Sequence, residues 1–321
     1  MKKFTKFLKD RSGATAVTFG LLLVPLLGMT GLAVDYSLAS NERSKLQNAA
    51  DSAALAGASI YIGTNSAQAE ARARAYLKAN LGEQAANAVT INFKADNQLV
   101  TVSLNGLSGT TFMRVLNKNS VPIGVTATAL APLKPTTATI TIDKVTGYWF
   151  KRISIVGVKD GKETVVGTIA YTAKDHSGEG GRGTGTTVPG LDSPVTFQLG
   201  DYKTLYLKME VKTDGCDIGY RNTSTGNTVT CKASSNSAYA GYNSTLRTDD
   251  PLTVNNLFVD DVRLPKGSTP PVLDLLSCDG ADHKHAWEDG GSADNVIQPD
   301  FFYRIKSSCK AVDNENVRLT H

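Results

Sequence analysis

The stretch that decides the fold runs from Arg11 to Ala58 and reads RSGATAVTFGLLLVPLLGMTGLAVDYSLASNERSKLQNAADSAALAGA. It begins with apolar residues and ends with alanines among polar residues, without a turn signal between the two parts. No charged residue occurs from Ala14 to Val34. A helix over these residues rises about 30 Å, the thickness of the hydrocarbon core of a bilayer. The first part is therefore long and apolar enough to span a membrane.

Basic side chains crowd the residues before this span. They are Lys2, Lys3, Lys6, Lys9 and Arg11, and only Asp10 opposes them. Basic residues on one side of a span hold that side in the cytoplasm. We therefore expect residues 1–12 to be a cytoplasmic leader, residues 13–34 to be a single transmembrane helix, and the bulk of the chain to be periplasmic or extracellular.

A cleaved secretory signal is the alternative interpretation of the same residues. Ser37, Leu38 and Ala39 satisfy the small-residue rule for cleavage. The apolar region of a cleaved signal is usually about 7 to 15 residues long, which is shorter than the run found here. The helical pattern also continues beyond the proposed cleavage point. The sequence therefore favours an uncleaved anchor.

The helix is expected to continue past Asp35, because the following residues are rich in alanine and lack proline. Small or apolar residues recur on one face at steps of three and four, and Ala16 with Gly20 repeats the small-residue pattern inside the span. Such a face allows a partner helix to approach closely, or it packs on the protein's own sheet. The candidate helix-packing residues are Ala16, Gly20, Leu46, Ala50, Ala53, Gly57 and Ile60.

A small antiparallel sheet is predicted after a second helical run over residues 66–88. Residues 88–106 alternate apolar and polar side chains around a turn at 95–98, as a hairpin does, and residues 120–132 supply a further strand. Pro132 and Pro135 close the unit. We expect an α+β domain over residues 35–132 and a linker over residues 133–137.

This order of elements resembles a known family. The basic leader, the run AVDY followed by AADSAALAGA, the hairpin and the strand VPIGVTATALA are similar to the TadE/TadG-like proteins of tight-adherence (Flp) pilus assembly in bacteria. The resemblance covers about residues 1–132. It implies a pilin-like domain on a membrane helix, a place in the bacterial inner membrane, and other pilus-assembly proteins as partners.

Two departures from related patterns bear on this resemblance. Processed pilins of the type IV class carry a glycine before the cleavage point and a glutamate at the fifth residue after it. Gly13 matches that glycine, but the fifth residue is Thr18. The larger members of the resembling family often carry a von Willebrand type A domain, and its Asp-x-Ser-x-Ser metal motif does not occur in this sequence. We therefore expect a subunit that stays in the inner membrane and a second half of another kind.

The second half, residues 138–321, is predicted to be a β-rich domain. Its apolar runs are short, rich in Val, Ile, Thr and aromatic residues, and separated by Gly, Pro, Asp and Asn. Many short strands at this spacing indicate a β-sandwich or a jelly-roll-like domain. The glycine-rich stretch 175–190 lacks the ending of a phosphate-binding loop, and we interpret it as a mobile loop.

The four cysteines all lie in this half, and they are Cys216, Cys231, Cys278 and Cys309. An even number in an oxidising compartment indicates disulfides. Four cysteines allow three pairings, and pairing in sequence order gives the smaller loops. Zinc binding with His283 and His285 is the competing hypothesis, which the absence of a Cys-x-x-Cys pair weakens.

An acidic, glycine-containing segment lies between the last two cysteines. A glycine-rich acidic loop can fold carboxylates around a calcium ion, whereas a plain solvated loop needs no ion. His283, Lys284 and His285 supply positive charge that opposes the calcium hypothesis. The candidate calcium ligands are Asp279, Asp282, Glu288, Asp289, Asp294 and Asp300.

The composition and motifs limit the possible functions. The 321 residues include 34 basic and 30 acidic side chains, and this balance gives no reason to expect nucleic-acid binding. We found no nucleophile-elbow or His-Glu-x-x-His pattern, so no catalytic residue is assigned. Two hypotheses remain: a structural or assembly component of an envelope pilus, and a membrane-anchored adhesin whose β-domain binds a glycan or another surface ligand, with or without calcium.

Overall fold

A computed structural model describes residues 12–175, 177, 183–290, 298–312 and 315–320 of the chain. These residues form two compact units. The first unit contains residues 12–61, 65–131 and 316–320, and the second contains the described parts of residues 62–64 and 132–315. The chain therefore leaves the first unit and returns to it at its C-terminal end.

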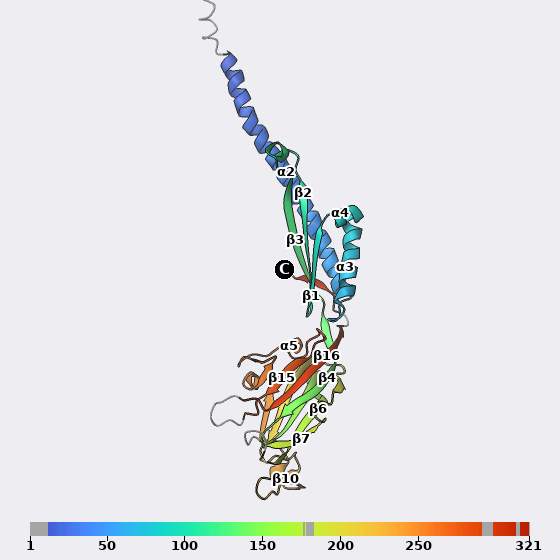
Figure 1. Ribbon diagram of the computed structural model, residues 1–321, viewed down its shortest axis with the longest axis vertical. Coiled ribbons are helices and arrows are strands. Elements are labelled where there is room, and N and C mark those ends of the chain that lie inside the picture. Colours follow the sequence, from blue (N-terminus) through green and yellow to red (C-terminus); the bar gives the residue numbers. More distant parts are fainter. Residues whose placement is uncertain (1–11, 176, 178–182, 291–297, 313–314, 321) are drawn as a thin grey trace, which may run out of the picture. The chain divides into compact units, whose positions relative to one another are not determined.

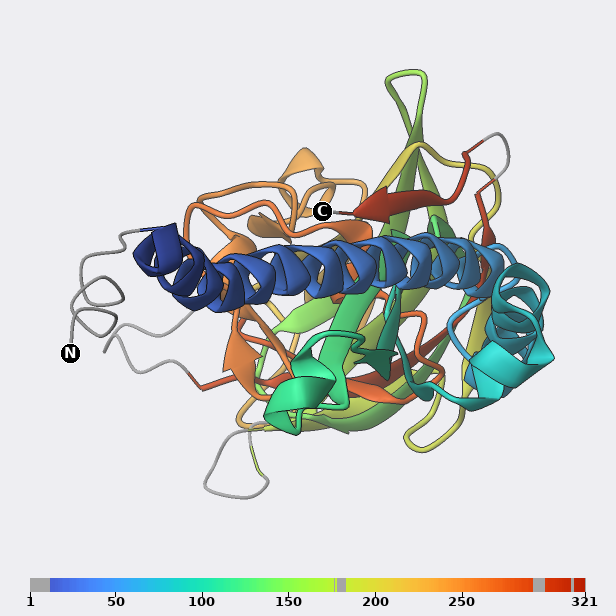
Figure 2. The same cartoon turned by 90° about the horizontal axis from the view of Figure 1, so that it is seen from above.

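The first unit combines one long helix, two shorter ones and a four-stranded antiparallel sheet of order β1-β2-β3-β17 (Figure 1). Figure 2 shows α2 (blue) as one continuous helix, with α3 and α4 (cyan) beside its C-terminal end. The bounds are α2 Ser12–Ala58, α3 Ser66–Leu81, α4 Glu83–Asn87, β1 Thr90–Asp96, β2 Leu99–Gly109, the 3-10 helix η1 Met113–Leu116, β3 Ser120–Leu130 and β17 Arg318–Thr320.

The second half of α2 packs on this sheet and on α3 through small side chains. Ala50 and Ala53 are fully buried, as are Val100 and Leu104, which β2 contributes to the same core. A Cβ atom at Gly57 would lie 3.2 Å from the carbonyl oxygen of Ala69 in α3. Small residues thus let α3 approach α2 closely, as they do in helix pairs generally.

The second unit is a β-sandwich. A five-stranded sheet of order β12-β9-β5-β6-β7 and a six-stranded sheet of order β14-β13-β15-β16-β4-β8 share one apolar core. The bounds are β4 Leu133–Val145, β5 Phe150–Lys159, β6 Lys162–Asp175, β7 Thr184–Val188, β8 Val195–Gln198, β9 Thr204–Lys212, β10 Tyr220–Asn222, β11 Cys231–Ala233, η3 Ser237–Tyr239, β12 Ser244–Arg247, η4 Val254–Asn256, β13 Leu257–Val259, β14 Val262–Arg263, α5 Val272–Leu275, β15 His283–Trp287 and β16 Phe301–Ala311.

The core of the second unit holds large side chains from both sheets. Ile153 and Met209 come from the five-stranded sheet, and Trp287, Phe301 and Tyr303 come from the six-stranded sheet. Alternation along each strand places these side chains inward and polar ones outward. The expected α+β class, with an N-terminal helix and small sheet followed by a β-rich second half, is confirmed.

The domain boundaries differ from the expected ones at two places. Residues 133–137 are the beginning of β4 instead of a linker, and Pro135 is accommodated opposite Cys309, where the β4–β16 register shifts. Arg318–Thr320 belong to the first unit, because β17 pairs with the edge of β3 and satisfies backbone groups there.

Candidate functional site

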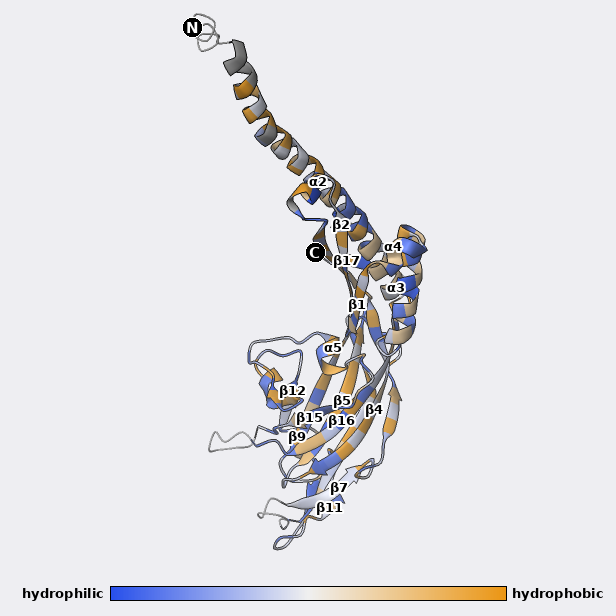
Figure 3. Cartoon of the chain, turned by 45° about the horizontal axis from the view of Figure 1, so that its top comes forward, coloured by the Kyte–Doolittle hydropathy of each residue, from blue (hydrophilic) through white to orange (hydrophobic). Residues whose placement is uncertain are grey.

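The first half of α2 exposes large apolar side chains to its surroundings. Figure 3 shows this run of hydrophobic residues along the N-terminal part of the helix. Only 6% of its most apolar 18-residue window is buried. The exposed residues include Val17, Phe19, Leu21, Leu22, Leu26, Leu27 and Met29. An exposed apolar surface of this kind marks a membrane or protein contact, and α2 is the one described helix long and apolar enough to span a membrane.

A buried carboxylate ends the apolar run. Asp35 is the first charged residue after it, and its two oxygens accept hydrogen bonds from three consecutive backbone N–H groups. The donors are Thr111 at 2.7 Å, Phe112 at 3.0 Å and Met113 at 2.7 Å, all in the loop between β2 and β3. Hydrogen bonds to a charged acceptor are among the strong ones in proteins. Asp35 therefore fixes this loop to the helix.

Gly31 completes this contact one helical turn earlier. A Cβ atom there would lie 2.7 Å from Cβ of Phe112, which is closer than side chains approach one another. The sequence alone did not predict the clamp formed by Gly31 and Asp35. The run AVDY was the only signal in the sequence, and the partner loop lies 76 to 78 residues away.

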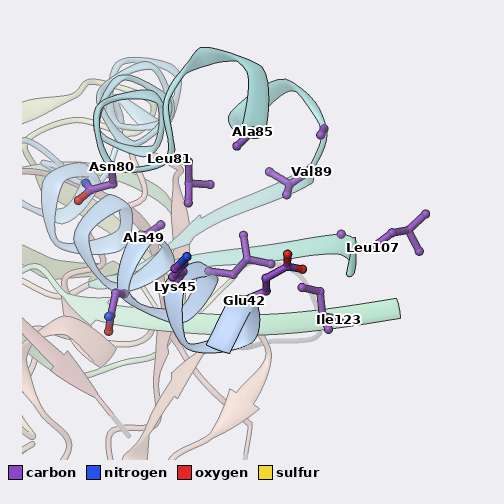
Figure 4. A pocket seen from close by; sticks show the side chains of 13 residues that line it. Glu42, Lys45, Ala49, Asn80, Leu81, Ala85, Val89, Leu107 and Ile123 are labelled. Carbon is purple, nitrogen blue, oxygen red and sulfur yellow. The ribbon is translucent and has the colours of Figure 1, made fainter. Parts of the chain in front are cut away.

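An open groove of about 680 Å³ lies between α2, the α3–α4 region and the sheet. Figure 4 shows Leu81 and Val89 on one side of it and Glu42 and Lys45 on the other. Its lining is partly apolar and partly charged.

The structure separates the candidate helix-packing residues into three groups. Leu46, Ala50, Ala53 and Gly57 are buried inside the first unit, so the protein's own sheet and α3 cover the face that we had considered for a partner helix. Gly20 is exposed, and Ile60 lies beyond the end of α2 with 38% of its surface exposed. The side chain of Ala16 is outside the described ones.

The cysteines form two disulfides, with the pairing in sequence order. Cys216 bonds to Cys231, and Cys278 bonds to Cys309. The second bond joins the segment before β15 to the end of β16, and the first closes the segment that contains β10. Bonded sulfurs are not thiolate ligands, so this pairing opposes the zinc hypothesis.

Three of the six candidate calcium ligands come together in the second unit. Oxygens of Glu288, Asp289 and Asp300 lie within 4.8 Å of one another, and all three residues are buried. The fully buried ammonium of Lys151 lies 3.2 Å from Asp289 Oδ2 and 3.4 Å from Asp300 Oδ2, and it donates a 2.6 Å hydrogen bond to the carbonyl of Thr146. We call the side chains of Lys151, Glu288, Asp289 and Asp300 the lysine cluster.

The lysine cluster does not fit a calcium ion well. Calcium takes about six to eight oxygen ligands, and here the ammonium already contacts oxygens of two of the three carboxylates. Burial, together with the charges of Asp289 and Asp300, raises the pKa of Glu288 above its ordinary value, which favours its neutral form. The cluster is thus an internal ion pair network.

The other three candidate ligands lie elsewhere. Asp279 contacts Nε2 of His283 at 3.0 Å, while Asp260 contacts Nδ1 of the same ring at 2.7 Å. Burial alone would lower the pKa of His283, but the two carboxylates raise it above its ordinary value. Asp282 is exposed, and Asp294 lies outside the described residues. We expected a subset of the six candidates to come together, and among the described residues that subset is Glu288, Asp289 and Asp300.

His285 is buried beside the core aromatic residues of β15 and β16. Its Nδ1 lies 3.0 Å from the hydroxyl of Tyr303, to which Trp287 also donates a hydrogen bond at 3.2 Å. Burial lowers the pKa of His285 to about 3, so the ring is neutral at physiological pH. His285 is thus a neutral member of the core.

Comparison with known proteins matches the same helix that carries the exposed apolar surface. Residues 13–59 match a family model described as "Putative Flp pilus-assembly TadE/G-like". The match confirms the resemblance for these residues and supports a role related to Flp pilus assembly. The remainder of the chain lies outside the match, and searches of curated proteins and of solved structures found no match.

Proposed function

We propose that this chain is a membrane-anchored structural or assembly component of a bacterial tight-adherence (Flp) pilus system and acts through protein–protein contacts. One observation carries the proposal: the family match and the exposed apolar surface occupy the same helix, α2. The N-terminus lies in the cytoplasm, the first half of α2 crosses the inner membrane once, and the rest of the first unit and the second unit lie outside the cytoplasm.

The subunit stays in the membrane instead of entering a fibre. A buried carboxylate at the fifth position of a processed pilin can pair with a neighbouring subunit, because an unpaired charge in an apolar environment is costly. Thr18 offers no such charge. The leucines of α2 are therefore a lipid-facing anchor.

The groove between α2 and α3–α4 is the surface through which we expect a partner protein to bind. It belongs to the first unit, and it combines exposed apolar side chains such as Leu107 with the charges of Glu42 and Lys45. A photo-crosslinking amino acid in place of the exposed, groove-lining Ala85 tests this directly. The matched control carries it in place of Leu252, an exposed residue of the second unit.

The experiment is irradiation of cells followed by purification of the full chain and identification of adducts by mass spectrometry. We expect the Ala85 variant to crosslink other pilus-assembly proteins and the Leu252 variant not to do so. Absence of such adducts from both variants, together with binding of a glycan array by the full chain, would support the anchored adhesin instead.

A further inference from the structure

The loop between β2 and β3 exposes apolar side chains at the point where it meets α2. Phe112 is 49% exposed and Val115 is 89% exposed. Two large apolar side chains exposed on one short loop are a feature of surfaces that contact an apolar phase. We call residues 110–119 the tip loop.

The tip loop is held in a defined conformation. The three N–H groups of Thr111, Phe112 and Met113 bind Asp35, and the N–H of Thr110 donates to the carbonyl of Asn119 at 3.1 Å, which closes the base. Within the loop, η1 ends at Asn117 in the left-handed conformation. Hydrogen bonds therefore hold the tip loop in the conformation that exposes its apolar side chains.

Positive charge accompanies these apolar side chains. Arg114 and Lys118 are exposed, and residues 110–120 contain no acidic side chain. The nearest carboxylate, Asp35, is buried and engaged by backbone donors. Long cationic side chains next to apolar ones suit a surface that is apolar below and carries phosphate groups above.

The tip loop contacts α2 at the end of its uncharged run. Gly31, which contacts Phe112, is within the run, and Asp35 is the first residue after it. One helical turn, about 5.4 Å, separates these two positions along the helix. Tyr36, a residue type that gathers at membrane–water interfaces, is also exposed here.

We propose that the tip loop is a lipid-contact site, which inserts Phe112 and Val115 into the non-cytoplasmic interface of the bilayer while Arg114 and Lys118 bind lipid phosphates. The proposal rests on the membrane anchoring of α2 proposed above. A helix alone fixes neither its depth nor its tilt, whereas a second contact clamped to it at Asp35 restrains both. The clamp thereby sets the height at which the first unit stands on the membrane.

Quenching of tryptophan fluorescence by brominated lipids tests the contact. The full chain is reconstituted in vesicles of phosphatidylethanolamine and phosphatidylglycerol brominated near the headgroup end of the acyl chains, and in a second set brominated near the middle of the acyl chains, the depth of Leu26 in the proposed span. Three variants are compared: Val115→Trp in the tip loop, Leu26→Trp in the anchor, and Tyr76→Trp on α3. All three positions are exposed, and the two native tryptophans belong to the second unit, so the unsubstituted chain provides the background signal.

We expect the added tryptophan of the Val115→Trp variant to lose roughly half of its emission, since interfacial side chains lie about 5–10 Å deep, and that of Tyr76→Trp to be unaffected. Adding Arg114→Gln and Lys118→Gln should make the quenching of Val115→Trp independent of phosphatidylglycerol content. If Leu26→Trp is quenched and Val115→Trp is not, the tip loop faces another partner, such as a protein, and this inference is overturned while the anchor stands. If Leu26→Trp is also unquenched, the anchor and this inference both fail.

Discussion

The first half of α2 and the core of the second unit differ in where their large apolar side chains lie. Leucines of the first half of α2, such as Leu22 and Leu26, are exposed, while small residues such as Ala50 and Ala53 are buried where the second half of α2 packs. In the second unit, Trp287 and the other large core residues are buried, and two disulfides and the lysine cluster add further constraints.

This difference indicates where the chain needs a partner. The second unit buries most of its largest apolar side chains in its own core, as a self-sufficient domain does. The first unit exposes leucines on α2, and only another apolar phase can cover these leucines. The helix α2 is therefore the part of the molecule that best indicates its function.

The largest predicted effect is the loss of stability of the second unit when the charge of Lys151 is removed. Lys151→Met leaves the carboxylates of Asp289 and Asp300 buried without their cation, and breaking a buried ion pair in this way costs about 4 kcal/mol. Denaturant unfolding followed by tryptophan fluorescence measures it, because both tryptophans lie in the second unit. Lys284→Met, at a side chain that is 67% exposed, is the control and should be near neutral. Equal effects of the two changes would refute the cluster's role.

The disulfides give the next largest predicted effect. Replacing Cys278 and Cys309 by Ala should lower the free energy of unfolding of the second unit by about 3.5 kcal/mol, and replacing Cys216 and Cys231 by about 3 kcal/mol, because longer closed loops restrict the unfolded chain more. Thiol titration of the unfolded, unreduced protein should find none among the four cysteines. Four reactive thiols would contradict both the pairing and the oxidising compartment.

Replacing leucine by alanine at two positions of α2 tests the difference between its buried and its exposed parts. Leu46 is 7% exposed and Leu26 is 58% exposed. Leu46→Ala should destabilise the first unit by about 3 kcal/mol because it leaves a cavity, whereas Leu26→Ala should change its stability by less than about 0.5 kcal/mol. Hydrogen exchange of the β2 and β3 amides in the full chain measures the stability change caused by each substitution. A large loss of protection on Leu26→Ala would show that the protein itself covers this leucine.

The smallest predicted effect concerns the pH dependence of the second unit. Burial lowers the pKa of His285 from 6.5 to about 3, so below pH 6.5 the unfolded chain binds a proton that the folded chain excludes. This group therefore favours the fold above pH 6.5 and loses that contribution as the pH falls toward 3, by about 2 kcal/mol between pH 7.5 and pH 5.

His283 acts in the opposite direction. Its raised pKa contributes stability that is present below the unfolded value of 6.5 and is lost as the pH rises through the folded value. Asp260 and Tyr303 also face the His285 ring, so the effect is isolated by difference. We compare unfolding at pH 7.5 and pH 5 for His285→Phe and for the unsubstituted chain. An identical pH dependence of the two would contradict the neutral buried histidine.

Local patterns predicted the features that depend on neighbouring residues. The missing charges from Ala14 to Val34 indicated the apolar helix, and the alternation around residues 95–98 indicated the hairpin that β1 and β2 form. The division of a chain into a helix-led half and a β-rich half follows from such periodicities.

Features that depend on distant residues were not predictable from these patterns. In the sequence, Asp35 looks like an ordinary helix residue, and only the fold shows that Thr111 and its neighbours bind it. Lys151 likewise looks like a surface residue of a strand, and only the fold shows that Asp289 and Asp300 pair with it. The pairing of β17 with β3 also joins residues that are distant in the sequence, so local patterns did not predict it. For Asp35 and Lys151, hydrogen bonds and ion pairs with distant residues offset the desolvation cost of burial, and only the assembled fold brings these partners together.

The central claim is that the first half of α2 is an uncleaved membrane anchor. The most direct test is mass spectrometry of the chain recovered from alkaline-washed membranes. We predict that the chain stays in the washed membranes and still contains the leader, residues 1–12, ahead of the span. Recovery in the soluble wash, or a chain that begins at Ala14 or Ser40, would contradict the account.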